Sequence, residues 1–190
     1  MWTRGEAVSD TEKAALVENS VKGDSDSFGK LYELHVDQVY RHIYYRVGNS
    51  VDAEDLTAQV FLNAWRAVPR YKNMGRPFQV WLLSIANNLV IDHYRARRSQ
   101  TSLDDVVIAS DDRDDPVAAA ERAMDSEEVR DAIIKLKRDH QQVIVLRFID
   151  GLEYPDIAAI MGKSEGAVRV IQHRALAALK GILKSERIQQ

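Results

Sequence analysis

Apolar residues recur at three- and four-residue steps along most of the chain, which is the spacing of one face of an α-helix. The longest early example runs from Ser25 to Val47, over roughly six helical turns. Its apolar positions are Phe28, Leu31, Tyr32, Val36, Val39, Tyr40, Ile43 and Val47. A shorter helix is expected from Asp10 to about Val21, with Ser9 or Asp10 as its cap and Gly23 as its breaker. This pattern predicts an all-α fold.

The next helix is expected to begin after Gly48-Asn49-Ser50 and to carry two distinct faces. Acidic residues in its first turn suit the positive end of the helix dipole. The inward face is predicted to hold Ala53, Leu56, Val60, Ala64 and Val68. A second side carries Asp55, Gln59, Leu62 and Arg66, with Phe61 and Trp65 near its edge. For each of these residues taken alone there is also a structural explanation: the acidic residues stabilise the helix dipole, and the aromatic residues pack in the core.

From Pro69 to Pro77 the chain is predicted to form a loop that carries several cations and Tyr71. The helix expected after it, from Pro77 to Arg98, begins apolar and ends in a basic cluster. Stabilisation of the helix dipole is the structural explanation of that cluster. Aromatic rings beside cations are also the combination that binds single-stranded DNA, in which bases stack on rings while cations hold the backbone. Both explanations are open at this point.

The chain changes character between Ser99 and Arg130, where ten acidic residues face three Arg, a net charge of -7. With Ser and Asp clusters and little helical periodicity before about Val117, this stretch predicts a linker. Beyond it a second helical set begins, in which Asp139 and Gln142 are placed for a reciprocal cap. The expected division is an N-terminal segment at 1–23, a domain at 24–98, a flexible acidic linker at 99–125 and a second domain at 126–190.

The stretch from 139 to 180 predicts a helix-turn-helix. An apolar run ends at Asp150-Gly151, and Pro155 stands where the first residue of a helix is favoured. Gly162 can adopt the left-handed conformation that ends this short helix, and Ser164 can cap the following one. From Glu165 onward the apolar residues at helical spacing are Val168, Ile171, Ala175, Leu179 and Ile182.

The other face of this last helix carries cations and amides, of the kind that contact phosphates and base edges in a major groove. They are Arg169, Gln172, His173 and Arg174, with Lys163 just before the helix. Two amphipathic helices joined by a glycine-containing turn also occur in proteins that never bind DNA. From Gly162 to Gln190, however, six Lys/Arg face two Glu, whereas the whole chain has a net charge of -3. This basic patch on an acidic chain favours nucleic-acid binding.

Composition excludes several other classes. The 190 residues contain no cysteine, and the five His do not fall at ligand-pair spacing, so neither a disulfide scaffold nor a metal site is expected. The first residues lack the apolar core of a signal peptide, and no stretch approaches the length of a membrane span, so a cytoplasmic protein without membrane insertion is expected. No phosphate-binding glycine loop or nucleophile elbow is present, so the chain is not expected to be an enzyme or to bind a cofactor.

Four segments, taken in order, carry a resemblance to one family. They are Asp52 to Trp65, Phe78 to Leu82, Ile91 to Arg95 and Gly166 to Ala175. In this order and at these distances along the chain, with an acidic linker before the last segment, they resemble the bacterial RNA polymerase sigma factors of the extracytoplasmic-function (ECF) group, in the sigma-70 family. The resemblance covers roughly residues 25–98 and 129–183, which is most of the chain.

The resemblance implies three binding surfaces. Core RNA polymerase would bind Asp55, Gln59, Phe61, Leu62, Trp65 and Arg66. The minus-ten promoter element, including a flipped non-template base, would bind Tyr71, Lys72, Asn73, Arg76, Phe78, Trp81, Asn87, Asn88, Asp92, Arg95 and Arg98. The minus-thirty-five element would bind Lys163, Ser164, Glu165, Arg169, Gln172, His173 and Arg174 in its major groove.

The same resemblance implies a further partner, an anti-sigma protein that covers these surfaces. The sequence departs from the family's pattern in two places. Asn87 stands where a basic residue is frequent, and Ile171 and Gln172 exchange an apolar and a polar position in the recognition helix. A free-standing helix-turn-helix regulator is the alternative. It would share the C-terminal half but should also show a dimerisation surface or a receiver domain, and the sequence suggests neither.

Overall fold

The computed structural model describes residues 8–73, 75–100 and 120–188, and every regular element in these residues is helical. The N-terminal set consists of α1 (Asp10–Val21), α2 (Ser25–Val47), α3 (Ser50–Ala67), the 3-10 turn η1 (Val68–Arg70) and α4 (Phe78–Gln100). The C-terminal set consists of α5 (Ala120–Ile134), α6 (Arg138–Ile144), the π-helical turn η2 (Val145–Ile149), α7 (Tyr154–Met161) and α8 (Glu165–Ile188). The all-α prediction is confirmed.

The predicted helix boundaries in both sets coincide with capping groups. Gly48 has a φ of 74° and ends α2, and the Asn49 side chain then accepts a 3.0 Å hydrogen bond from the backbone N–H of Asp52 at the start of α3. Gly162, with a φ of 61°, ends α7 in the left-handed conformation. Ser164 Oγ accepts from the N–H of Ala167, at 3.2 Å, and so caps α8. The turn of the helix-turn-helix therefore forms as its sequence predicts.

Two local features differ from the sequence prediction. Of the segment predicted as linker, 99–125, residues 101–119 lie outside the described residues, while α4 extends to Gln100 and α5 already begins at Ala120. Acidic charge suggested a linker, but Ala, Glu, Arg and Met from 118 onward are strong helix formers. The reciprocal cap of Asp139 and Gln142 is wrong. Lys137 is the N-cap of α6 and makes no side-chain capping bond, while Gln142 donates to Asn87 on α4.

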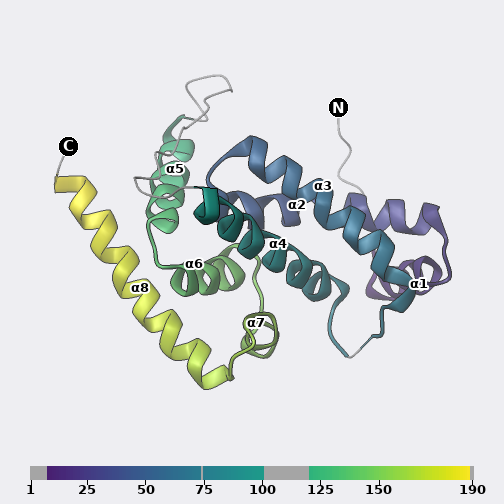
Figure 1. Ribbon diagram of the computed structural model, residues 1–190. Helices are drawn as coiled ribbons and strands as arrows, with labels where there is room; N and C mark the ends of the chain where they lie inside the picture. The colour runs from purple at the N-terminus through teal and green to yellow at the C-terminus, as the bar shows by residue number, and fades with distance from the viewer. Residues whose placement is uncertain (1–7, 74, 101–119, 189–190) are drawn as a thin grey trace.

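Helix α4 belongs to both sets (Figure 1). Its residues Phe78, Leu82, Ala86 and Val90 join the core that α2 and α3 build. Its residues Val80 and Leu83 instead join the core of the C-terminal set. The two groups alternate at helical spacing, so they lie on two sides of one helix. The C-terminal set therefore packs directly onto the helix that is expected to follow the minus-ten element.

Candidate functional site

The outer side of α3 forms an exposed surface that we name the α3 face: Asp55, Gln59, Leu62, Trp65 and Arg66. Leu62 is 55% exposed and Trp65 is 38% exposed, although both are large hydrophobic residues. Phe61 was predicted to belong to the same surface, and the structure places it largely in the core. The inward residues of α3 are buried as the sequence predicts. An exposed Leu beside an exposed Trp is typical of a protein-binding surface.

Helix α2 supports the α3 face and extends it. The ring of Tyr32 packs edge-on against Phe61, with centroids 4.7 Å apart, and the ring of Phe28 lies 5.0 Å from that of Trp65. Tyr32 falls at helical spacing with the other apolar residues of α2. It is instead 43% exposed. The surface therefore includes one aromatic residue that the sequence did not reveal, because a ring at the boundary of an apolar stripe fits the same pattern as a buried one.

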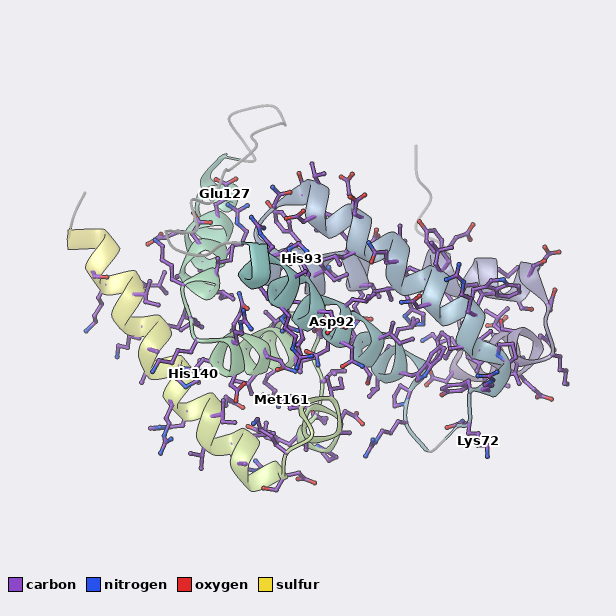
Figure 2. The ribbon with its side chains drawn as sticks, viewed as in Figure 1. Lys72, Asp92, His93, Glu127, His140 and Met161 are labelled. Carbon is purple, nitrogen blue, oxygen red and sulfur yellow. The ribbon has the colours of Figure 1, made fainter. Side chains whose placement is uncertain are left out.

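An aromatic cluster anchors the loop between η1 and α4. The ring centroid of Tyr71 lies 5.4 Å from that of Phe78 and 5.0 Å from that of Trp81. Asn73 accepts a 2.9 Å hydrogen bond from the N–H of Gly75, which has a φ of 75° and turns the loop back toward α4. Lys72 is exposed and projects from this loop (Figure 2). Aromatic rings and a cation thus share one side of the molecule, as single-stranded nucleic acid requires.

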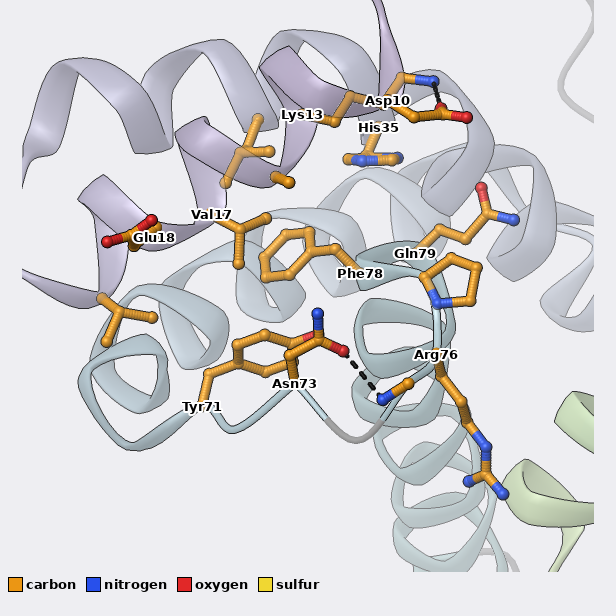
Figure 3. A pocket seen from close by; sticks show the side chains of 15 residues that line it. Asp10, Lys13, Val17, Glu18, His35, Tyr71, Asn73, Arg76, Phe78 and Gln79 are labelled. Carbon is orange, nitrogen blue, oxygen red and sulfur yellow. Dashed lines mark hydrogen bonds and ion pairs between the residues drawn. The ribbon is translucent and has the colours of Figure 1, made fainter.

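Behind this loop lies a cavity of about 940 Å³ (Figure 3). Its walls come from α1, α2, the loop and the start of α4, and they include Val17, His35, Tyr71 and Phe78. Burial lowers the pKa of His35, and the nearby charge of Lys13 lowers it further, while a hydrogen bond with Gln38 acts in the opposite direction. At neutral pH the imidazole is therefore uncharged. Helix α1 therefore closes the part of the cavity that faces the loop.

The minus-ten residues predicted on α4 fall on two of its sides. Asn88, Asp92 and Arg95 are exposed, and Arg95 lies 3.3 Å from Asp92, one turn away. Asn87 is only 3% exposed and faces the C-terminal set. Arg98 lies on α4, but its side chain is outside the described residues. The structure thus brings three of these side chains together on an open surface and directs Asn87 elsewhere.

The helix-turn-helix places its basic residues around the start of α8. Lys163 pairs with Asp139 of α6 at 3.2 Å, and Glu165 is exposed in the first turn of α8. The guanidinium of Arg169 lies 3.8 Å from the ring centroid of Tyr154, which holds its side chain against α7. His173 and Arg174 are exposed farther along α8.

Three other residues of α8 differ in burial from what their polarity suggests. Gln172 is partly buried, and its Oε1 is buried without a hydrogen-bond partner in the described residues. Val170 and Leu176 are exposed, although the sequence drew attention only to polar residues on this side. Exposed apolar side chains beside Arg169 and His173 can contact thymine methyl groups. The signal was present in the sequence, because neither residue belongs to the apolar set that packs inward.

The described residues contain no group of three or more His, Cys, Asp or Glu that could hold a metal ion. None of the helices searched in the described part of the chain combines the length and apolar character of a membrane span.

Comparison with known proteins identifies the two helical sets. Residues 31–100 match the family model of Sigma-70 region 2, and residues 126–179 match that of Sigma-70, region 4. The ECF RNA polymerase sigma factor BldN of Streptomyces coelicolor is 37% identical over 173 residues, covering 90% of this chain and 66% of BldN. SigW of Bacillus subtilis is 30% identical over 176 residues, covering 86% of this chain and 92% of SigW. The structure of CnrH in complex with the cytosolic domain of CnrY matches with a TM-score of 0.69 at 26% identity, covering 93% and 99% of the two chains.

Proposed function

Because the chain belongs to the ECF sigma factors of the sigma-70 family, we propose that it binds core RNA polymerase, directs it to specific promoters and helps to melt the minus-ten element. The observation that carries this function is the pairing of two surfaces in one chain. An exposed apolar α3 face is suited to a protein partner, and exposed cations on α8 are suited to DNA. The chain acts in the cytoplasm, where this partner works, and it acts by binding rather than by catalysis.

The α3 face docks on core polymerase. Trp65 and Leu62 supply the apolar centre of the contact, and Tyr32 of α2 enlarges it. Asp55, Gln59 and Arg66 surround that centre with polar groups. An aromatic anchor within a polar rim is the usual anatomy of a protein interface. Phe61 acts from beneath the surface, where its ring holds that of Tyr32.

The loop after η1 and the open side of α4 bind the minus-ten element. Extracting a base from duplex DNA costs a few kcal/mol, which stacking and pocket contacts must offset. Tyr71 and Trp81 offer partly exposed rings for stacking, and Phe78 supports them from below. Cations and amides along the loop and α4 hold the strand: Lys72, Asn73, Arg76, Asn88 and Arg95. Asp92 positions Arg95 through their ion pair.

The start of α8 reads the minus-thirty-five element in the major groove. Arg174 and His173 are free to meet phosphates or base edges, and Arg169 is held in a defined orientation by Tyr154. Lys163 lies at the turn, and Ser164 is committed to capping α8. Val170 and Leu176 add apolar contacts. Each of the two DNA-binding surfaces is weak by itself, but one polymerase holds both, so binding of the first raises the effective concentration of the second. Promoter choice therefore arises in the assembled holoenzyme.

An anti-sigma protein is a further partner. The related CnrH was solved in complex with CnrY, and the α3 face offers this chain a comparable apolar docking surface. A protein that covered Leu62 and Trp65 would exclude polymerase from the same residues.

Run-off transcription with bacterial core polymerase on a library of randomised promoters tests the proposed function. We expect start sites that share two spaced motifs and that vanish when the protein is omitted. A chain that selected duplex DNA by itself, while transcription never depended on it, would instead be a free-standing regulator.

A further inference from the structure

Two guanidinium groups pack on one tyrosine ring beside the helix-turn-helix. Cζ of Arg169, on α8, lies 3.8 Å from the ring centroid of Tyr154, the first residue of α7. Cζ of Arg147, on η2, lies 4.9 Å from the same centroid. Both distances are within the range of cation–π contacts, in which arginine stacks on an aromatic ring. Three elements of the C-terminal set therefore meet at this ring, where α7 lies beside the start of α8 (Figure 1).

The fold anchors the ring and the first of these two cations. Tyr154 is partly buried and packs against the core of the C-terminal set. Nη1 of Arg147 donates a 2.7 Å hydrogen bond to the backbone carbonyl of Leu152 and lies 3.0 Å from Oε1 of Glu153. The guanidinium of Arg147 is thus bonded to the segment just before α7. Because the ring is held in this way, it can orient another long side chain that packs on it.

Arg169 uses its guanidinium differently from Arg147. Its side chain is exposed, and at 3.8 Å from the centroid its charged group is in van der Waals contact with the Tyr154 ring. Among the residues that the structure describes, it has no hydrogen-bond or ion-pair partner. The N–H donors of Arg169 therefore remain for an acceptor outside the chain.

The other cations near the start of α8 do not combine these two properties. Lys163 lies 3.2 Å from a carboxylate oxygen of Asp139. His173 and Arg174 are exposed, and within the described part of the chain they make no hydrogen bond, ion pair or ring contact. A side chain without such contacts loses more rotamer freedom when it binds a base. Of these four cations, Arg169 is the one that is both oriented by the protein and unbonded.

An oriented and unbonded guanidinium matches one base in particular. Arginine donates two parallel hydrogen bonds to N7 and O6 of guanine in the major groove, which is the commonest base-specific contact. No other base presents a pair of acceptors on that edge. Because the donors of a guanidinium lie in its plane, the group can stack on a ring through its face and still donate through its edge.

We propose that Tyr154 is a positioning residue, which holds Arg169 for two hydrogen bonds to a guanine of the minus-thirty-five element. This inference rests on the proposed function of α8 and assigns to that surface a base and the residue that supports its reader. Tyr154 acts through the orientation of Arg169. Loss of the ring should therefore remove the part of the base discrimination that orientation contributes, whereas loss of the guanidinium should remove all of it.

Base discrimination by the reconstituted holoenzyme tests this inference. The library of randomised promoters identifies the base pair at which Arg169→Ala changes the preference, and we expect a G·C pair. The wild type should favour guanine there by about 5- to 150-fold, and Arg169→Ala by less than about twofold. Tyr154→Leu should lose about three- to tenfold of this discrimination, whereas Tyr154→Phe, which keeps the ring, should lose less than about twofold.

Two further measurements separate a base contact from a general effect. Promoter DNA with 7-deazaguanine at this pair has a C–H group in place of the N7 acceptor, so it should bind the wild-type holoenzyme more weakly and the Arg169→Ala holoenzyme unchanged. A variant that combines Tyr154→Leu with Arg169→Ala should discriminate as Arg169→Ala does, because the ring acts only through that side chain.

Phe148→Leu is the matched control. It removes an exposed aromatic ring from η2, next to Arg147 in the sequence, and should leave the base preference unchanged. Circular dichroism shows whether each variant is folded. If Tyr154→Leu does not fold, Tyr154→Met, which fills the same space with an unbranched apolar side chain, takes its place.

Unchanged discrimination in a folded variant without the ring would overturn the positioning role of Tyr154. An equal loss of affinity for every promoter would also overturn it, because a merely structural role has that effect. The guanine contact is rejected if Arg169→Ala changes the preference at no G·C pair, or if 7-deazaguanine there does not weaken wild-type binding. In these cases the wild type still supports promoter-dependent transcription. A wild-type chain that never does so refutes the proposed function, and this inference with it.

Discussion

His42 and Asp150 form a fully buried polar contact across the two helical sets, with 2.6 Å between Nδ1 and Oδ2. They are 108 residues apart in the sequence. His42 lies on the side of α2 that contributes Ile43 and Val39 to the core, and Asp150 ends η2. The contact therefore joins the folding of the C-terminal set to that of the N-terminal set.

Replacing Asp150 with Ala should lower the free energy of unfolding by about 1–3 kcal/mol, because it leaves a buried imidazole nitrogen without its partner. Urea denaturation followed by circular dichroism measures the change. Glu18→Ala is the control, since it removes an exposed ion pair with Lys22 and should change stability by less than about 0.5 kcal/mol. An equal effect of the two substitutions would show that the buried contact contributes no more to the free energy of unfolding than an exposed ion pair does.

Truncating Leu62 to Ala should weaken binding to core polymerase by about tenfold, as expected for a residue near the centre of an interface. The stability of the Leu62→Ala variant should be unaffected because the Leu62 side chain is 55% exposed. Leu34→Ala is the matched control: it makes the same change on α2, where Leu34 is 38% exposed and lies off the α3 face. The dissociation constant can be measured with a fluorescent chain and purified polymerase. Equal loss from both substitutions would place the docking surface elsewhere.

Arg174→Ala should weaken binding of the holoenzyme to its promoter by roughly 1–3 kcal/mol if Arg174 contacts a base, and should change promoter preference. If Arg174 contacts a phosphate, affinity should fall for all sequences and the salt dependence should decrease by about one ion. Titrations at several salt concentrations separate the two results. Lys184→Ala, an exposed cation farther along α8, should change neither quantity. If the Arg174→Ala holoenzyme bound its promoter as tightly as the wild type, Arg174 would not belong to the DNA-binding surface.

The imidazole of His35 should make the protein less stable at acidic pH. Burial lowers its pKa, Lys13 contributes in the same direction, and a hydrogen bond with Gln38 opposes the shift. The folded state therefore binds fewer protons than the unfolded state once the pH falls below about 6.5. Between pH 7 and pH 5, the free energy of unfolding should consequently decrease more for the wild type than for His35→Gln. Parallel decreases in the two proteins would contradict this prediction.

The helix boundaries could be predicted from the sequence because they depend on neighbouring residues. Gly162 and Ser164 end one helix and start another through bonds within a few residues, and Gly48 with Asn49 does the same between α2 and α3. The surface exposure of Lys163, Arg169, His173 and Arg174 also agrees with the sequence pattern, since charge and spacing are local properties, and their contact with DNA stays a prediction.

Contacts between distant segments could not be predicted in this way. Gln142 looked like a capping residue for α6, yet its amide bonds to Asn87, 55 residues away in the sequence. Tyr32 falls at the spacing of the apolar residues of α2, yet it lies at the surface beside Phe61. In both cases the local pattern was compatible with two positions of the side chain, and packing of another helix decided between them.

The sequence by itself therefore determined the helices, the helix-turn-helix and the family, because these depend on periodicity, capping residues and motif order. Only the tertiary structure decided that the C-terminal set packs on α4 and that Asn87 is buried there with Arg46. The physical reason is that a buried charge requires a partner, and the partner comes from wherever the fold brings an acceptor within hydrogen-bonding distance. Periodicity along one helix carries no information about that distance.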